Sequence, residues 1–278
     1  MKAAKPSKLL AALAKCAGGF VADWEDFVFL HYALPAAELA FHIPYPLDTL
    51  DGRAFISFVS FRLERMRPAR ACGLPAAISR ILLRPISNHQ FLNLRTYVRG
   101  PAGPGIHFIA EWIDNHLSAR VGPGAYGLPY RCAEMQRTDL TSGGLRHIHV
   151  RDEETAQSAS FVVPMRPDRA AGPVTAGSLD EFLLERYRAY THQEGTGRWF
   201  LVKHPAWEAA PFTLARTNTA LQEKLYPWFQ HAMFIGGHLA AGFRDVGMGP
   251  PHTLTAAAGA TAASSAREAA CEALNPAR

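Results

Sequence analysis

Alternation of apolar and polar side chains is the most regular pattern in this chain. It is clearest in residues 91–99, where Asn93, Arg95 and Tyr97 alternate with leucine, valine and one threonine. A period of two is typical of a half-buried β-strand, so this segment has one polar face with a central arginine. Further strands are predicted over residues 24–32, 53–63, 106–113, 132–140, 145–151, 158–163 and 199–203.

Helical signals are fewer. Ser178 and Glu181 form a capping box, and apolar residues at helical spacing follow as far as Tyr190. A second helix is expected to begin at Asp114 or Asn115 and to end at Gly122. Shorter helical segments are predicted over residues 36–42 and 219–225.

These elements define a fold class of predominantly antiparallel β (α+β), with two or three helices on the outside. We expect a single domain over residues 21–253. Residues 1–20 are interpreted as a tail or a short helix, and the Ala/Ser-rich residues 254–278 as a disordered tail.

The stretch from Gly122 to Met135 is rich in glycine and proline and carries Tyr126, Tyr130 and Arg131. Glycine permits unusual backbone angles and proline fixes φ, so the stretch is predicted to form a rigid loop. Such a loop is either a tight turn or one wall of a pocket that holds the two phenols and the guanidinium in place.

Charge and composition argue against a nucleic-acid-binding or membrane-spanning protein. The chain has 278 residues and a net charge of +5, but it contains no basic run of the kind that nucleic-acid binders show. No segment approaches the roughly 20 apolar residues that cross a bilayer. Four widely spaced cysteines favour reduced thiols, although one bridge is left open. We therefore expect a cytoplasmic protein with no nucleic-acid or membrane partner.

Six short blocks stand in order along the chain. They are residues 29–32 (Phe-Leu-His-Tyr), 51–55 (Asp-Gly-Arg-Ala-Phe), 92–98 (Leu-Asn-Leu-Arg-Thr-Tyr-Val), 126–130 (Tyr-Gly-Leu-Pro-Tyr), 181–187 (Glu-Phe-Leu-Leu-Glu-Arg-Tyr) and 204–207 (His-Pro-Ala-Trp). Together these blocks resemble the YqjF-like family of uncharacterised bacterial proteins. The resemblance implies a fold similar to that of acetoacetate decarboxylase, a curved antiparallel sheet or β-cone around an apolar pocket.

Acetoacetate decarboxylase uses the amine of a lysine in a Gly-x-Pro-Lys-Lys loop, and that resemblance places Tyr130 and Arg131 at the two lysine positions. A tyrosine cannot form an imine and an arginine stays protonated, so Schiff-base decarboxylation is not expected. Lys203 is the nearest lysine candidate, with no ground for placing it in the pocket. The resemblance also suggests that Arg95 replaces a glutamate of that enzyme.

Asn93, Arg95, Tyr97, Tyr130 and Arg131 are the predicted ligand-binding residues. Together they would suit a small carboxylate or carbonyl compound, held by charge-assisted hydrogen bonds. Alternatively, Tyr130 and Arg131 serve a dehydratase, isomerase or hydrolase without a Schiff base.

The structural alternative is that Arg95 pairs with a carboxylate such as Glu111 and that the tyrosines only cap the sheet. No cofactor and no metal is predicted, since His147 and His149 lack a third ligand. Formation of a homo-oligomer is left open.

Overall fold

The computed structural model describes residues 6–71, 76–140, 144–213 and 215–254, and the strands lie in one sheet. The expected tail at 255–278 lies outside the described residues. The strands are β1 (Phe20–Pro35), β2 (Arg53–Pro68), β3 (His89–Gly100), β4 (Gly103–Ile113), β5 (Tyr130–Leu140), β6 (Leu145–Asp152), β7 (Ser158–Pro164), β8 (Gly172–Pro173), β9 (Arg188–Gln193), β10 (Thr196–Lys203), β11 (Glu208–Phe212), β12 (Arg216–Asn218), β13 (Met233–Met248) and β14 (His252–Thr253).

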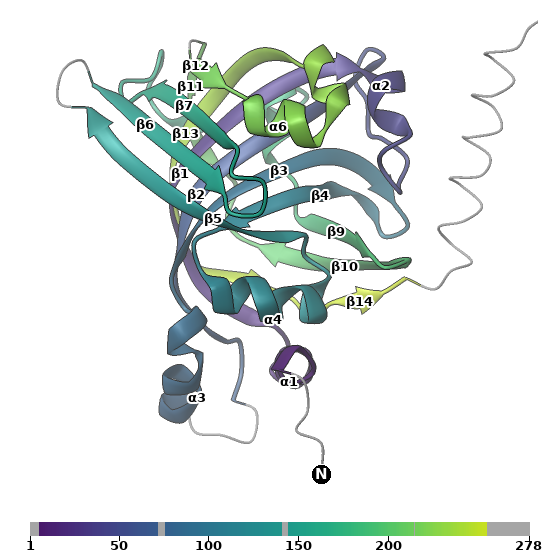
Figure 1. The fold of residues 1–278 in the computed structure, drawn as a ribbon, viewed down its shortest axis with the longest axis vertical. Helices are drawn as coiled ribbons and strands as arrows, with labels where there is room; N and C mark the ends of the chain where they lie inside the picture. Colours follow the sequence, from purple (N-terminus) through teal and green to yellow (C-terminus); the bar gives the residue numbers. More distant parts are fainter. Residues whose placement is uncertain (1–5, 72–75, 141–143, 214, 255–278) are drawn as a thin grey trace, which may run out of the picture.

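Six α-helices lie around the sheet in the described part of the chain, whereas two or three were expected (Figure 1). The 3₁₀ helices η1 (Arg84–Ile86) and η2 (Pro227–His231) join neighbouring elements. The α-helices are α1 (Pro6–Cys16), α2 (Ala36–Ala40), α3 (Ala76–Leu83), α4 (His116–Tyr126), α5 (Leu179–Leu184) and α6 (Ala220–Leu225).

The sheet closes partly into a ring. Strands β1 to β4 form an antiparallel meander, and β13 pairs with the other edge of β1. The hairpin of β9 and β10 then links β4 to β13 through short pairings. Most pairs are antiparallel, as predicted, but β4 pairs in parallel with both β5 and β9. A strongly curved sheet of this kind leaves an inner and an outer face.

The outer face is covered by other parts of the same chain. Strands β5, β6 and β7 leave the ring, and α6 lies above it (Figure 1). Leu92 and Leu94 of β3 pack in the same buried cluster as Ile148 of β6 and Phe161 of β7. The outward side chains of β1 to β4 therefore help to build a hydrophobic core and do not face solvent.

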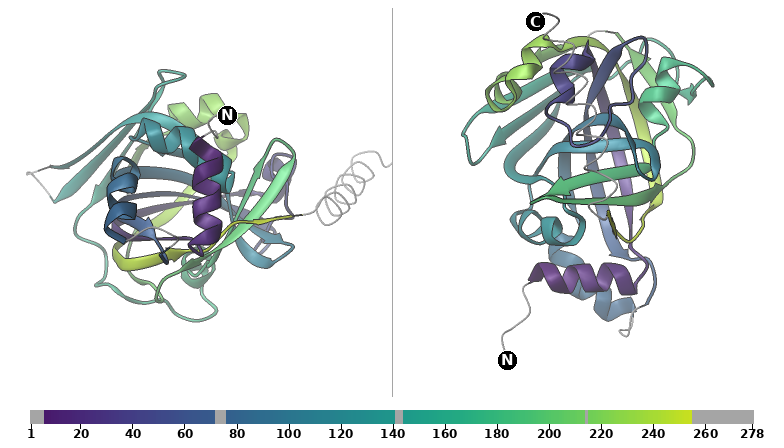
Figure 2. Two further views of the ribbon diagram at one scale, coloured as in Figure 1. Left: turned by 90° about the horizontal axis from the view of Figure 1, so that it is seen from below. Right: turned by 90° about the vertical axis from the view of Figure 1, so that its right-hand side faces the viewer.

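Helices α1 and α4 cover one end of the ring (Figure 2). Ala14 of α1 is buried in the same cluster as Val121 and Tyr126 of α4. The Tyr126 ring lies 5.0 Å from that of Phe200 on β10, measured between centroids. The two helices thus close one end of the ring, where they pack against Phe20 of β1 and Phe200 of β10.

The Gly/Pro-rich stretch is not the loop that the sequence predicted. Helix α4 continues through Gly122 and Pro123 and ends only at Gly127, which has a left-handed φ of 70°. A Cβ at Gly122 would lie 2.3 Å from the ring of Tyr130, so glycine allows the helix to approach β5. Burial of the helix against the ring stabilises it despite its poor intrinsic propensity.

Helix α5 is shorter than its sequence pattern indicated. Its capping was predicted correctly, because the Ser178 side chain accepts a hydrogen bond from the Glu181 amide at 3.2 Å. The helix ends at Leu184, however, and Tyr190 belongs to β9, where it is paired with both β10 and β4. Long-range strand pairing overrides the local helical spacing in this segment.

Strand β13 had no predicted counterpart. It contains Gly236, Gly237 and Gly242, which interrupt any alternating pattern, yet it pairs with β1 along almost its whole length. Cys16 is disulfide-bonded, against the expectation of reduced thiols. In the described part of the chain, no helix has the length and apolar character of a membrane span.

Candidate functional site

A cavity of about 100 Å³ lies inside the ring. This is room for several waters or one small organic molecule, given about 10–15 Å³ per water by the same measure. Its wall is mostly apolar, with Phe27, Phe61, Phe91 and Trp207 among the lining side chains. The polar side chains that line it are His89, Asn93, Arg95, Glu111, Ser118, Tyr126, Tyr130, Arg186 and His204.

Three polar lining residues form a row across adjacent strands. Asn93 of β3 is the register partner of Glu111 of β4, which is in turn the partner of Tyr130 at the start of β5. The β3–β4 register shifts between Leu94 and Arg95, so Phe108 and Glu111 both line the cavity although they are three residues apart. This row places a carboxyl, an amide and a phenol on one side of the cavity.

Arg95 is buried and has no carboxylate partner among the described residues. One terminal nitrogen donates to the Leu183 carbonyl oxygen at 3.2 Å, and the guanidinium lies 5.6 Å from the centre of the Phe29 ring. Its Nε is buried without a hydrogen-bond partner. The pairing with Glu111 that the structural alternative gave as its example is absent, since no ion pair within 4.0 Å joins these two described residues.

Buried polar atoms without a partner gather at this cavity. Such atoms are uncommon in folded proteins, because desolvation without a hydrogen bond costs about 1–3 kcal/mol each. Six lining residues of the described chain carry one, and a bound polar molecule or water would satisfy them. They are Trp24 (Nε1), His89 (Nδ1), Asn93 (Oδ1), Arg95 (Nε), Glu111 (Oε2) and Ser118 (Oγ).

Burial changes the protonation of the groups in the row. It raises the pKa of Glu111 to about 8, so this carboxyl is largely neutral at pH 7. Burial, together with Glu111 and Tyr126, raises the pKa of Tyr130 well above its usual value. Arg186 also lines the cavity, but its guanidinium is 2.8 Å from the buried carboxylate of Asp48. Arg95 is therefore the uncompensated charge of the cavity at neutral pH.

A chain of hydrogen-bonding side chains lies beside Arg95. His31 Nδ1 is 2.7 Å from Ser57 Oγ, which is 2.6 Å from the hydroxyl of Tyr97. On its other side, His31 Nε2 is 3.1 Å from His238 Nδ1, where the chain ends. His238 Nε2 lies 3.3 Å from a carboxylate oxygen of Asp180 but without hydrogen-bond geometry. Burial, His238 and Arg95 lower the pKa of His31, so His31 is neutral and can both donate and accept.

The five ligand-binding residues predicted from the sequence do not all line the cavity. Asn93, Arg95 and Tyr130 line the cavity, and the Tyr97 ring lies behind it, with its centre 6.0 Å from the Arg95 guanidinium. Arg131 lies elsewhere: it follows Tyr130 on β5 and so points to the opposite face. Its guanidinium pairs with Asp152 through Nε at 2.5 Å and with Glu154 at 2.9 Å.

Sequence reasoning missed several residues of this region, namely His31, Ser57, Arg186 and His238. The spacing of Phe27, Phe29 and His31 is a period of two, which could have placed His31 on the inner face. No such signal exists for His238, because β13 lacks an alternating pattern.

No lysine lines the cavity within the described residues. Lys203, the nearest candidate in sequence, is exposed at the end of β10, whereas its neighbour Val202 lines the cavity. An amine that could form a Schiff base is thus not available on the described wall.

A partly closed, strongly curved sheet around a cavity defines a class of fold, and solved structures of this class are known. Acetoacetate decarboxylase from Legionella pneumophila matches with a TM-score of 0.58 and 12% identity, over 85% of this chain and 87% of that one. The enduracididine biosynthesis enzyme MppR with HEPES bound matches with a TM-score of 0.60 and 11% identity, over 85% and 88% of the two chains. An acetoacetate decarboxylase-like enzyme from Sphingomonas wittichii RW1 has a TM-score of 0.57 and 15% identity, over 85% and 94%. The acetoacetate decarboxylase-like fold is shown by these structures.

The chain belongs to the family DUF2071, described as an uncharacterized conserved protein, whose model matches residues 21–230. The uncharacterized protein YqjF of Bacillus subtilis (strain 168) is 29% identical over 186 residues, which are 66% of this chain and 72% of YqjF. The resemblance drawn from the six sequence blocks is confirmed.

Proposed function

We propose that this protein binds a small carboxylate, or a carbonyl compound that carries one, inside the ring. The observation that carries this proposal is the buried guanidinium of Arg95, which has an unpartnered Nε and no carboxylate partner in the described part of the chain. A buried charge without a counter-ion is costly, and an anionic ligand would compensate it. Arg131 has no part in the proposal because Asp152 and Glu154 occupy its guanidinium.

The ligand class follows from the rest of the wall. The side chains around Arg95 and Asn93 are largely aromatic, so the ligand needs an anionic end and a small apolar body. Asn93 supplies an amide oxygen that lacks a donor, which suits a hydroxyl or an amine on the ligand. MppR, which shares the fold, has been solved in complex with pyruvate, and pyruvate is therefore a first probe.

A thermal-shift titration with pyruvate and benzoate tests the proposal, with acetone and benzamide as uncharged controls. A ligand at 100 times its Kd adds about 2.7 kcal/mol to the free energy of unfolding. Arg95→Met should abolish the shift or weaken binding by about 10- to 100-fold, the value of a charge-assisted hydrogen bond. Arg131→Met is the matched control: it should lower the melting temperature but keep the ligand-induced shift.

An equal shift in Arg95→Met, or an equal shift from the uncharged analogues, would contradict an anion site at Arg95.

A second candidate function is proton transfer to or from the bound compound, and Glu111 is the observation that favours it. A carboxyl with a pKa of about 8, next to Tyr130, is protonated yet able to lose its proton near neutral pH. Such a pKa is the one a general acid or base requires. This chemistry needs no Schiff base.

Exchange of the methyl protons of pyruvate in deuterated water, followed by proton NMR, distinguishes the two functions. If Glu111 transfers protons, the wild type accelerates the exchange and Glu111→Gln does not, while both give the same pyruvate-induced thermal shift. If the wild type does not accelerate the exchange, ligand binding without proton transfer is the function that remains. Tyr130→Phe tests whether the phenol only positions the ligand, in which case its binding weakens and exchange persists.

A further inference from the structure

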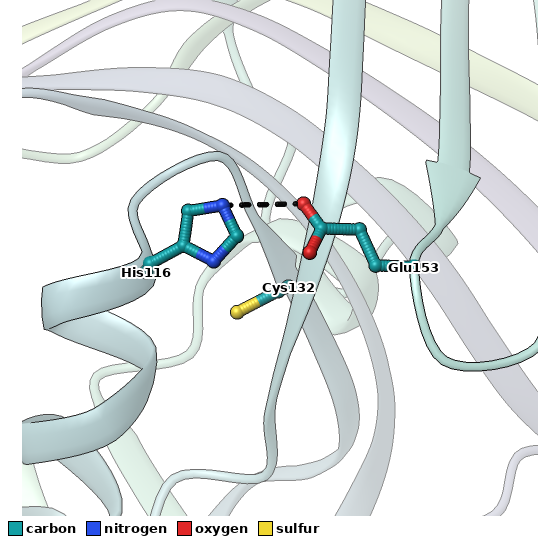
Figure 3. Close-up of side chains that lie close together, drawn as sticks. All are labelled: His116, Cys132 and Glu153. Atoms are coloured by element: carbon teal, nitrogen blue, oxygen red, sulfur yellow. Dashed lines mark ion pairs between the residues drawn. The ribbon is translucent and has the colours of Figure 1, made fainter.

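Three side chains of different chemistry meet on the surface, away from the cavity. His116 is the first residue of α4, Cys132 lies on β5, and Glu153 follows β6 (Figure 3). One nitrogen, the sulfur and one oxygen of these residues lie within 4.8 Å of one another. We propose that they form a binding site for one divalent transition-metal ion of the zinc type.

The backbone fixes the relative positions of the three residues. The Glu153 amide donates to the Cys132 carbonyl oxygen at 3.1 Å, which ties β5 to the turn after β6. The side chain of Asn115, which caps α4, accepts from the Ser118 amide at 2.8 Å and donates to the Pro85 carbonyl oxygen at 2.8 Å. His116 therefore begins the helix at a fixed position, and only its side chain has to adjust.

The donor set is the one that zinc prefers. Thiolate sulfur, imidazole nitrogen and carboxylate oxygen bind Zn²⁺ at about 2.0–2.3 Å, so donors around a tetrahedral ion lie roughly 3.3–3.7 Å apart. His116 Nε2 and Glu153 Oε1 are already 3.3 Å apart. Small rotations bring the set together, because the side chains of His116 and Glu153 are 72% and 36% exposed. A water would complete the fourth position.

The neighbouring arginine does not occupy the carboxylate of Glu153, which can therefore bind a metal ion. Arg131 pairs with the residues on either side of it, Asp152 and Glu154. In the described chain, Glu153 makes an ion pair only with His116, and that pair exists only when the imidazole is protonated. A metal ion would replace this proton.

The thiol of Cys132 also holds a proton before the metal binds. Burial and the carboxylates of Glu153 and Asp152 raise the pKa of Cys132. Formation of the metal–sulfur bond releases the thiol proton to solvent, so binding strengthens as pH rises. Cys132 is a free cysteine, and no oxidation step is needed.

Titration of the protein with Co²⁺, followed by absorbance, tests this site. Cobalt bound by a thiolate shows a near-ultraviolet charge-transfer band and intense visible bands in four-coordinate geometry. We expect these bands to saturate at one equivalent and to be absent in Cys132→Ser. His116→Ala and Glu153→Gln should each weaken metal binding by at least about tenfold. Changes to residues that only contact a metal ligand already cost about 10- to 100-fold in metal affinity.

The matched controls are His192→Ala and Glu134→Gln, which alter exposed residues outside the trio and should leave the titration unchanged. Zn²⁺ should displace cobalt from the wild type and slow alkylation of Cys132 by iodoacetamide. Absence of a thiolate band, or a band that persists unchanged in His116→Ala and Glu153→Gln, would overturn the proposal. None of the three residues lines the cavity, so this outcome is independent of carboxylate binding.

Discussion

Arg95 and Arg131 are both largely shielded from solvent, but their guanidinium groups have different partners. Arg131 makes two hydrogen bonds to the fully buried carboxylate of Asp152, through Nε at 2.5 Å and through a terminal nitrogen at 3.1 Å. Asp152 also accepts from Trp112 Nε1 at 2.9 Å. Arg95 instead donates to the Leu183 carbonyl oxygen, and its guanidinium lies near the rings of Phe29 and Tyr97.

The difference separates an arginine whose charge is compensated within the fold from one that, in our proposal, binds a ligand. Burial alone would raise the pKa of Asp152, but hydrogen bonds from Arg131, Thr155 and Trp112 lower it well below its usual value. The charge of Arg131 is thus neutralised within the protein. No described carboxylate neutralises the charge of Arg95, and its side chain lines the cavity instead.

The largest loss of stability expected from a single substitution is that of Arg131→Met. Removing one partner of a buried ion pair leaves the other charge uncompensated and costs about 3 kcal/mol. Arg95→Met removes an unpaired buried charge, so its free energy of unfolding should stay within about 1 kcal/mol of the wild type or increase. Urea unfolding of both variants at pH 7 measures the difference. Equal losses in the two variants would show that Arg95 is a structural residue as well.

A second test asks whether Glu111 is the missing counter-ion of Arg95. A carboxyl whose pKa is raised to about 8 by folding favours the folded state fully only below its unfolded pKa, near 4.5. This stability is lost as pH rises through about 8, at about 1.4 kcal/mol per pH unit in between.

Glu111→Gln should remove this slope, so urea unfolding between pH 5 and pH 8 should show a flatter profile than in the wild type. The exposed Glu134→Gln is the control and should keep the wild-type profile. Parallel profiles for wild type and Glu111→Gln would mean that Glu111 is ionised, and the contrast between the two arginines would then weaken.

The smallest expected effect comes from the hydrogen-bonded chain behind Arg95. Ser57→Ala leaves His31 Nδ1 and the Tyr97 hydroxyl without their shared partner and should cost about 1 kcal/mol of stability. Because the Tyr97 ring packs near Arg95, carboxylate affinity should fall by less than tenfold. Isothermal titration checks the affinity, with Ser158→Ala on β7 as the control. An unchanged carboxylate affinity would limit these hydrogen-bonded side chains to a structural role.

Local patterns predicted most of the strands and the inward row of Asn93, Arg95 and Tyr97, because a period of two is a property of the backbone itself. The same rule contradicts the expectation that Tyr130 and Arg131 act together. Neighbours on a strand point to opposite faces, so once β5 begins at Tyr130 only one of the two can face the cavity. The error came from reading this segment as a loop.

The metal-ligand trio shows a different limit. His116, Cys132 and Glu153 are 16 and 21 residues apart and match no known ligand spacing, so the sequence predicted no metal site. They come together because β4 pairs in parallel with β5, and β5 pairs with β6. Contacts of this kind depend on register between strands, which has no local signal.

By itself, the sequence determined the family and, through that resemblance, the curved and mostly antiparallel sheet. The polar inner face of β3 follows from a short-range period of two. Only the tertiary structure decided that α4 runs into the Gly/Pro-rich stretch as far as Tyr126, that Arg131 pairs with Asp152, and that no described carboxylate pairs with Arg95. Those outcomes depend on which distant segments share a buried space, and burial is settled by packing across the whole ring.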